Sequence, residues 1–261
     1  MSEQNPYSAP VSALSGDGVL ERERSYRYQP LDSLNRPLRG LLIATIAMLG
    51  ITMLTLAYQW WTLQRLVDHQ YASDSIMRST AHFSDRLFAS ASGFLALIHT
   101  AAYIFGGMWI YRAACNVRAL GAQGLDDSPG WAVGWYFIPF AGLVMPFRAM
   151  RQIWAGSLAP RQWRKLPTPG LLRWWWGLWL GINLFGMVVG FFVARAKLHS
   201  SDIPGLIQGV QLSMLNYLLS IGACALFLTV VTRMAQMQAK QHLAMTPPAL
   251  PVSKWPEPSI A

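Results

Sequence analysis

Five residues near the middle of the chain combine positive charge, an amide and an indole at helical spacing. Arg112 and Asn116 are four residues apart. Arg148, Arg151 and Trp154 follow one another in steps of three. Residues three or four apart share a face of a helix, guanidinium groups suit phosphate oxygens, and indole rings suit the lipid–water interface. The sequence therefore predicts that these five residues bind an anionic headgroup or another phosphate-bearing ligand.

The same arginines have a plainer explanation. In membrane proteins, Lys and Arg collect beside the cytoplasmic ends of helices, and their long side chains reach the headgroups without recognising one particular lipid. Arg161, Arg164 and Lys165 would also attract anionic lipid through charge alone. Specific binding and simple anchoring both remain open at the level of the sequence.

Catalytic and metal-binding patterns are absent from the sequence. It contains no H-E-x-x-H, G-x-S-x-G or Walker A motif, no paired carboxylates and no Cys/His cluster with metal-ligand spacing. The two cysteines, Cys115 and Cys224, are typical of small apolar filler residues. We therefore expect no catalytic residue, no cofactor, no metal and no enzymatic activity.

Long stretches without charge indicate that membrane helices position these side chains. Hydrophobic residues make up 53% of the chain and charged residues 13%, against about 25% charged in an average soluble domain. Five stretches are long enough for a helix to cross the hydrocarbon core, which takes about 20 residues. The predicted hydrophobic segments are residues 40–64, 87–111, 131–147, 174–194 and 204–232. Because they do not alternate as barrel strands do, we predict an all-α integral membrane protein with four transmembrane helices and a further proline-broken segment.

The two ends of the chain differ in composition from this membrane domain, which we place at residues 38–241. Residues 1–37 mix charges of both signs, and residues 242–261 are rich in proline. Neither end can bury a core, so both are predicted to be disordered cytoplasmic tails. The formal net charge of +9 is explained by basic residues beside the spans, so nucleic acid is not an expected partner.

The third hydrophobic segment is interrupted by two prolines. Pro139 and Pro146 each remove a backbone donor, which costs about 3 kcal/mol inside a helix. Trp131 and Trp135 precede them as interfacial rings, and we assign all four residues a structural role. The segment either enters the membrane and returns as a re-entrant or interfacial hairpin, which we favour, or it crosses as a kinked span.

The distribution of charge predicts the orientation. Residues 148–173 contain six Lys or Arg and no acidic residue, which is typical of a cytoplasmic loop. A hairpin keeps this loop on the same side as Arg36 and Arg39, whereas a span would move it outside. We therefore expect both termini in the cytoplasm and residues 65–86, where Asp and Arg balance, outside.

Residues 109–180 resemble a known family of bacterial membrane proteins. The stretches that carry the resemblance are WIYRAACNVRALG, SPGWAVGWYFIPFAGLVMPFRAMRQIWAGS and RWWWGLWL. The first contains Trp-x-x-Arg-x-x-x-Asn, and the second contains a Gly-Trp-Ala-x-Gly-Trp tract, two prolines and an Ile-Trp pair. In these features the chain is similar to the domain of unknown function (DUF) 4328. Many relatives carry Asn near Gly142 and Asp near Gln152, where this chain differs. The resemblance implies a multi-pass protein of the bacterial inner membrane, and it brings no known activity.

These observations favour a non-enzymatic membrane module that binds lipid headgroups or partner proteins at its cytoplasmic face. The alternative is a small transporter or channel in which the proline-broken segment lines the pathway. No Asp, Glu, Lys or Arg lies inside a predicted span, which counts against ion coupling. Membrane lipids are the expected partners, and faces with small residues four apart would allow self-association. These pairs are Gly177 with Gly181, Gly186 with Gly190, and Gly205 with Gly209.

Overall fold

The computed structural model describes residues 26–68, 73–198 and 203–245, and every regular element in this part of the chain is a helix. The elements are α2 (Asp32–Val67), α3 (Asp74–Ala119), α4 (Pro129–Gly134), η2 (Trp135–Phe137), η3 (Ala141–Leu143), α5 (Met145–Leu158), η4 (Pro160–Lys165), α6 (Gly170–Leu198) and α7 (Ile203–Met245). Four of them, α2, α3, α6 and α7, are long and apolar enough to cross a membrane. The prediction of a helical chain with four such helices is confirmed.

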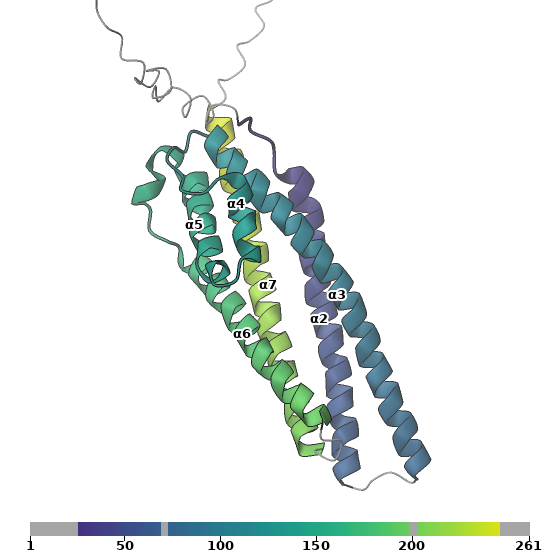
Figure 1. Cartoon of the computed structure of the whole chain (residues 1–261). Coiled ribbons are helices and arrows are strands. Elements are labelled where there is room, and N and C mark those ends of the chain that lie inside the picture. Colours follow the sequence, from purple (N-terminus) through teal and green to yellow (C-terminus); the bar gives the residue numbers. More distant parts are fainter. Residues whose placement is uncertain (1–25, 69–72, 199–202, 246–261) are drawn as a thin grey trace, which may run out of the picture.

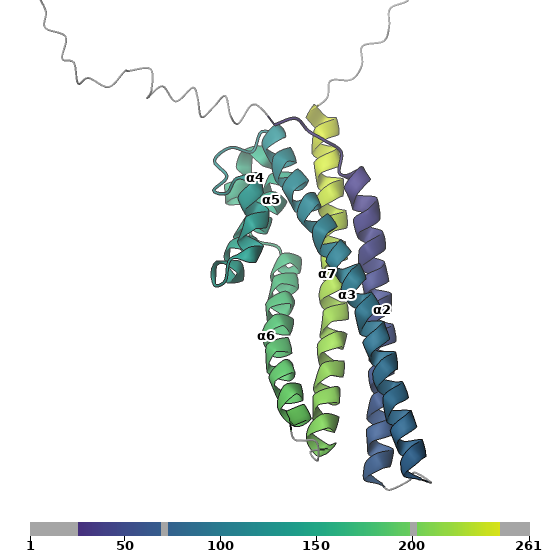
Figure 2. The same ribbon diagram turned by 45° about the vertical axis from the view of Figure 1, so that its right-hand side comes forward.

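The four long helices stand side by side in the order α3, α2, α7, α6 (Figure 1; Figure 2). The described chain begins and ends at the same end of this bundle (Figure 1), which we call the terminal end. We call the opposite end the far end; there α2 and α6 end, and α3 and α7 begin. A helix of the length of α7, 43 residues, extends roughly 65 Å at 1.5 Å per residue, about twice the hydrocarbon thickness of a bilayer. The bundle is therefore longer than the membrane that it could cross.

The third hydrophobic segment forms a helical hairpin, residues 129–158, and does not run the length of the bundle. It descends through α4 and η2, turns at residues 138–144, and returns through α5 (Figure 2). The chain before and after it meets at the terminal end, because Trp163 Nε1 donates to the carbonyl of Gln123 at 2.9 Å and Arg164 Nη2 donates to that of Gly124 at 2.7 Å. The segment therefore begins and ends on the same side of the bundle.

The prolines determine where the hairpin turns and restarts. Ser128 caps α4 by accepting from the amide of Trp131. Pro139 is exposed in the turn, next to Phe140, whose φ of 64° is the only positive value of a non-glycine residue in the described chain. Pro146 lies in the first turn of α5, where its missing donor costs nothing. The two prolines therefore delimit helices and do not kink a single span.

The predicted tail at residues 1–37 is wrong for its last part. Residues 26–31 are described, and α2 already begins at Asp32 with Pro37 inside it. Leu31, Leu34 and Leu38 are buried, because their spacing continues the apolar stripe of the first span toward the terminal end. At the other end of the chain, α7 continues to Met245, four residues beyond the predicted boundary. Residues 1–25 and 246–261, the rest of the predicted tails, lie outside the described residues.

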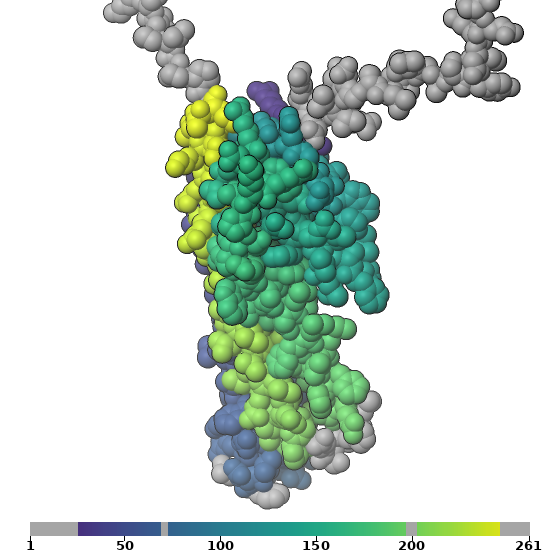
Figure 3. Space-filling model, turned by 90° about the vertical axis from the view of Figure 1, so that its left-hand side faces the viewer, coloured from purple at the N-terminus to yellow at the C-terminus, as the bar shows by residue number. Residues whose placement is uncertain are grey.

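Buried side chains concentrate in the half of the bundle nearer the terminal end. The hydrophobic core joins Trp109 and Val117 of α3 with Met150 of α5, Trp175 of α6 and Met234 of α7. The space-filling view shows the reason: the hairpin lies against the bundle there and projects from its side over α6 (Figure 3). Three layers of helix can bury residues that two adjacent helices leave exposed.

The glycine pairs have different surroundings. A Cβ on Gly209 would lie 2.9 Å from Val193 Cγ2, and one on Gly186 would lie 3.5 Å from Asn216 Nδ2, so these two glycines allow α6 and α7 to approach closely. Gly177, Gly181 and Gly190 have nothing within 4 Å of that position. The predicted small faces therefore serve packing within the chain at two positions.

Candidate functional site

A buried hydrogen-bond network lies at the terminal end and involves the predicted site residue Asn116. Asn116, Ser157 and Gln238 are each 0% exposed, and they come from α3, α5 and α7. Asn116 Nδ2 donates to Gln238 Oε1 at 3.0 Å, and Gln238 Nε2 donates to Ser157 Oγ at 2.9 Å and to the carbonyl of Ala113 at 3.1 Å. Every polar atom of the two amides is satisfied. The network holds the hairpin to the bundle.

The chain segment before α2 completes this network. The amide N–H of Gln29 donates to Asn116 Oδ1 at 3.0 Å, and Asn116 Nδ2 donates to the carbonyl of Gln29 at 2.8 Å. Next to this pair, the ring of Tyr28 stacks on that of His242 at 3.9 Å. Burial, and then the nearby charge of Asp32, raise the pKa of Tyr28. The side chain of Asn116 is therefore hydrogen-bonded to the backbone of its own chain and is not available to a ligand.

Trp154 also differs from the prediction, because it is buried. Arg148 and Arg151 are exposed, whereas Trp154 is only 8% exposed and belongs to the core. Each step of three residues turns a helix by about 300°, so two steps rotate a side chain by about 120° away from the starting face. The three residues follow a spiral, and only the two arginines share the outer surface of α5.

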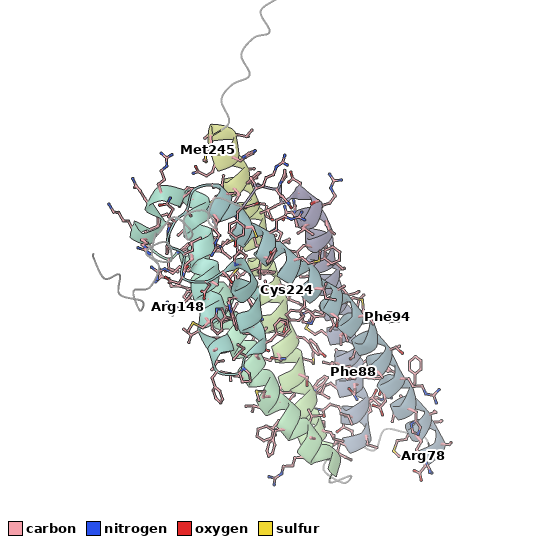
Figure 4. All side chains as sticks on the ribbon, turned by 45° about the horizontal axis from the view of Figure 1, so that its top comes forward. Arg78, Phe88, Phe94, Arg148, Cys224 and Met245 are labelled. Atoms are coloured by element: carbon pink, nitrogen blue, oxygen red, sulfur yellow. The ribbon has the colours of Figure 1, made fainter. Side chains whose placement is uncertain are left out.

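The predicted arginines lie at the same end but bind different neighbours. Arg112 Nη1 donates to Ser33 Oγ of α2 at 2.8 Å. Arg148 forms a salt bridge of 3.4 Å with Asp126, with both side chains about half exposed, and it projects from the outer side of the hairpin (Figure 4). Arg112 and Arg148 therefore flank the terminal end on the α2 and hairpin sides. Together with Asn116 and Trp154 they do not form one continuous binding face.

Two aspartates in the loop after α3 were missed by the sequence reasoning. Asp126 Oδ2 accepts from Gln152 Nε2 at 2.8 Å, and its backbone N–H donates to Gln152 Oε1 at 3.0 Å. Asp127 Oδ1 accepts from Trp135 Nε1 at 2.9 Å, and its carbonyl accepts from Arg118. These bonds attach the loop to both limbs of the hairpin. The sequence contained one signal for these contacts. Gln152 departs from the family pattern, and a polar side chain on an apolar helix needs a hydrogen-bond partner.

The tip of the hairpin exposes aromatic side chains. Phe137 is 83% exposed and Phe140 is 86% exposed. Above them, the rings of Trp131 and Trp135 lie 4.6 Å apart. Trp176 Nε1 of α6 donates to the carbonyl of Leu143 at 3.2 Å, which fixes the depth of the tip along the bundle.

An open cavity of about 560 Å³ lies on the other side of the loop, toward η4. Its lining residues are Gly121, Gln123, Pro160, Arg161, Gln162, Trp163, Arg164 and Lys165. Three of these side chains are cationic and none is acidic. Among the described residues, no group of three or more His, Cys, Asp or Glu side chains comes together in a way that could hold a metal.

Residues 72–236 match the family described as Domain of unknown function (DUF4328). The chain belongs to the DUF4328 family. Neither the curated proteins nor the solved structures with which the chain was compared gave a match.

The match of this DUF4328 protein covers α3, the hairpin, η4, α6 and most of α7. It includes Asn116 and Ser157 of the buried network, and it ends two residues before Gln238. Helix α2 and Gln29 lie outside it. The hairpin, the aspartate loop and the cavity are therefore all features of the family region of the chain.

Proposed function

We propose that this DUF4328 protein is a four-span protein of the bacterial inner membrane that binds anionic lipid headgroups at its cytoplasmic face without catalysing a reaction. In this arrangement the terminal end is cytoplasmic, and the hairpin enters only the cytoplasmic leaflet. The headgroups bind at the outer surface of the hairpin and not at the predicted five-residue face.

The distribution of charge supports this orientation. At the terminal end, cationic residues far outnumber Asp32, Asp126 and Asp127: they are Arg27, Arg36, Arg39, Arg112, Arg118, Arg148, Arg151, Arg161, Arg164, Lys165, Arg173, Arg233 and Lys240. At the far end, Arg65, Arg78, Arg86 and Arg195 are accompanied by Asp68, Asp74 and Asp85. An excess of Lys and Arg is typical of the cytoplasmic side.

The depth of the hairpin tip is the observation that carries the proposal. The tip carbonyl of Leu143 is bonded to Trp176, which is three residues past Arg173, the last charged residue before the apolar stretch of α6. Three residues of helix correspond to about 5 Å, whereas one leaflet of the hydrocarbon core is about 15 Å thick. The tip therefore reaches a level just inside one leaflet.

The side chains of the hairpin suit this depth. Phe137 and Phe140 project from the tip with nothing of the protein covering most of their surface, so contact with acyl chains would remove large apolar areas from water. Arg148 and Arg151 follow on α5 and are exposed, at the level of the lipid phosphates. Apolar rings below and guanidinium groups above are the pattern of an interfacial lipid-binding element.

Cysteine accessibility tests the placement of the hairpin. In a Cys115→Ser, Cys224→Ser background, we would compare Gln162→Cys, Phe140→Cys and Ser75→Cys, all at exposed positions. An impermeant thiol reagent should label Ser75→Cys in intact cells and Gln162→Cys only after lysis. Phe140→Cys should resist labelling in both. Labelling of Phe140→Cys as fast as Gln162→Cys would place the tip in water, and labelling of Gln162→Cys in intact cells would reverse the topology.

Lipid retention tests the binding. The Arg148→Gln, Arg151→Gln pair should retain anionic phosphatidylglycerol roughly thirtyfold less in native mass spectrometry, since each basic residue near a membrane surface contributes about 1 kcal/mol. Arg78→Gln, Arg86→Gln is the matched control, because both residues are exposed at the far end. Equal retention by the two double variants would remove the headgroup function.

Polar groups of α3, of the hairpin and of α7 support the second candidate, a small transporter or channel. The ring of His99 stacks on Tyr103 at 4.8 Å. The Tyr136 hydroxyl and Asn216 Oδ1 are buried without a hydrogen-bond partner among the described residues, and such groups inside a membrane mark pathways as well as packing. Solute flux in proteoliposomes that Asn216→Leu abolishes would favour this function over headgroup binding.

A further inference from the structure

Arg164, which lines the cavity beside η4, is held in position by its neighbours. Arg164 Nη2 donates to the carbonyl of Gly124 at 2.7 Å, and its guanidinium lies 5.3 Å from the ring centroid of Trp163. Trp163 is itself held by its bond to the carbonyl of Gln123. The guanidinium therefore needs little reorganisation to meet an anion.

Gly124 is required for this arrangement. Its φ is +64°, and a Cβ at this position would lie 2.6 Å from Arg164 Nη2. Any other residue would both strain the backbone and displace the guanidinium. The loop therefore has the backbone conformation and the space that hold Arg164 at the wall of the cavity.

The other cations of the cavity are free to bind a ligand. Within the described part of the chain, Arg161 and Lys165 form no hydrogen bond or salt bridge, and both are exposed. The amides of Gln123 and Gln162 also line the wall. The acidic residues of the same loop, Asp126 and Asp127, are bonded to Gln152 and Trp135 of the hairpin. Their charges are held on the hairpin side of the loop, and the cavity remains positive.

We propose that this cavity is a binding site for a phosphate-bearing anion, held by Arg161, Arg164 and Lys165. Its volume of about 560 Å³ falls in the range of roughly 300–1,000 Å³ that is usual for small-molecule sites. Three cations lining one cavity favour a ligand with at least two negative charges, and guanidinium forks match the oxygens of phosphate. The amides can donate to the same oxygens, and the Trp163 ring can cover an organic group.

The ligand could be a soluble phosphate ester or a phosphate on a lipid headgroup. For a lipid, the site deepens the proposed function and rests on it, because the terminal end must face anionic headgroups. A soluble anion would bind whether or not the hairpin enters a leaflet. The two inferences use different residues, so they can fail separately.

Titration with inorganic pyrophosphate tests the site without lipid. The full chain in nanodiscs of zwitterionic lipid should bind pyrophosphate saturably in isothermal titration calorimetry. Arg161→Gln, Lys165→Gln should weaken binding about tenfold or more, whereas Arg148→Gln, Arg151→Gln should not. Absence of saturable binding in the unmodified protein, or equal binding by both double variants, would overturn the proposal.

Gly124→Ala distinguishes a preorganised anion site from nonspecific electrostatic attraction of the anion. This variant keeps every charge but displaces Arg164, so we expect pyrophosphate to bind about fivefold or more weakly, as for loss of one charge-assisted hydrogen bond. Binding equal to that of the unmodified protein would show that net charge alone attracts the anion and would reject the site. Thermal melting of each variant in the nanodiscs verifies that it is folded.

Competition identifies the source of the ligand. If the headgroup occupies the cavity, pyrophosphate should displace phosphatidylglycerol in native mass spectrometry, and Arg161→Gln, Lys165→Gln should retain less of this lipid. Saturable pyrophosphate binding without displacement assigns the cavity to a soluble anion. Loss of lipid retention in Arg148→Gln, Arg151→Gln with no pyrophosphate binding in the unmodified protein would reject the cavity and keep the proposed function.

Discussion

The two ends of the bundle are built in different ways. At the far end charges of both signs occur, and Gln59 Nε2 of α2 donates to Asp85 Oδ1 of α3 at 2.9 Å. At the terminal end α3, α5 and α7 contribute three fully buried polar side chains, Asn116, Ser157 and Gln238. The hairpin, η4 and the segment before α2 all pack there.

This difference shows at which end of the bundle the packing must be specific. Near the far end, α6 and α7 approach through small residues such as Gly209, and packing of this kind needs only apolar contact. At the terminal end a hairpin must be held in one position, and a satisfied polar network can specify that position because any other leaves buried groups unpaired. The binding surfaces proposed above both depend on that positioning.

Breaking the network should have the largest effect on stability. Gln238→Leu keeps the volume but leaves a donor of Asn116 without its partner and removes the donor to Ser157, so we expect a loss of about 3 kcal/mol in unfolding free energy. Gln236→Leu is the matched control, because Gln236 is exposed on the same helix. Unfolding of both variants by SDS in mixed micelles measures the difference. Equal stability would mean that the network does not hold the terminal end.

Crowding the α6–α7 contact tests the other half of the comparison. Gly209→Ala would place a Cβ 2.9 Å from Val193 Cγ2, and Val193 is β-branched and cannot easily move, so we expect a loss of about 2 kcal/mol. Gly190→Ala has open space at its Cβ and should be neutral or slightly stabilising in the same SDS titration. If the two variants melt alike, the close approach of α6 and α7 is not a source of stability.

The loop that carries the cavity should be affected less. Gly124→Ala forces a residue with a Cβ into the left-handed region, at a cost of about 1.5 kcal/mol. Gly170→Ala at the start of α6 has nothing within 4 Å of the new Cβ and serves as the control. Equal melting temperatures of these two variants would contradict the strained conformation that we assign to Gly124.

The smallest effect is expected at the exposed salt bridge. Asp126→Asn removes the charge that faces Arg148 but keeps an oxygen for Gln152, so we expect a loss of less than about 0.5 kcal/mol. Raising the salt concentration should reduce this loss further, because the pair is about half exposed. A loss as large as that of Gln238→Leu would mean that the surface charges, and not the buried amides, hold the hairpin.

Much of the fold could be predicted from single residues and their order. The absence of charge between Arg39 and Arg65, and again in three later stretches, places four long helices correctly, because charge is costly in lipid wherever it lies along the chain. Pro139 and Pro146 predict a break, since proline acts on its own backbone. The family was also recognisable from the short Trp, Arg, Asn and Pro patterns. The start of α2 was missed because charged residues alternate with the buried leucines Leu31, Leu34 and Leu38, so this stretch is not an uncharged run.

The candidate site could be predicted only in part. Arg148 and Arg151 are exposed as expected, because their neighbours on α5 determine that face. Asn116 and Trp154 turned inward, and their partners come from other parts of the chain: Gln238 is 122 residues from Asn116, and Gln29 is 87 residues away. No local pattern indicates which distant amide a buried Asn will meet.

The sequence by itself determined that the chain is helical, where its apolar helices lie, where the third apolar segment must break, and to which family it belongs. These properties follow from local backbone preferences and from the cost of placing charge in an apolar environment. Only the tertiary structure decided that the broken segment returns as a hairpin and that Asn116 is hydrogen-bonded to the backbone of Gln29. It also decided that Arg164, bonded to the carbonyl of Gly124, lines a cavity. Those outcomes depend on which surfaces meet when distant helices pack, and pairing of that kind is set by shape and hydrogen-bond geometry in three dimensions.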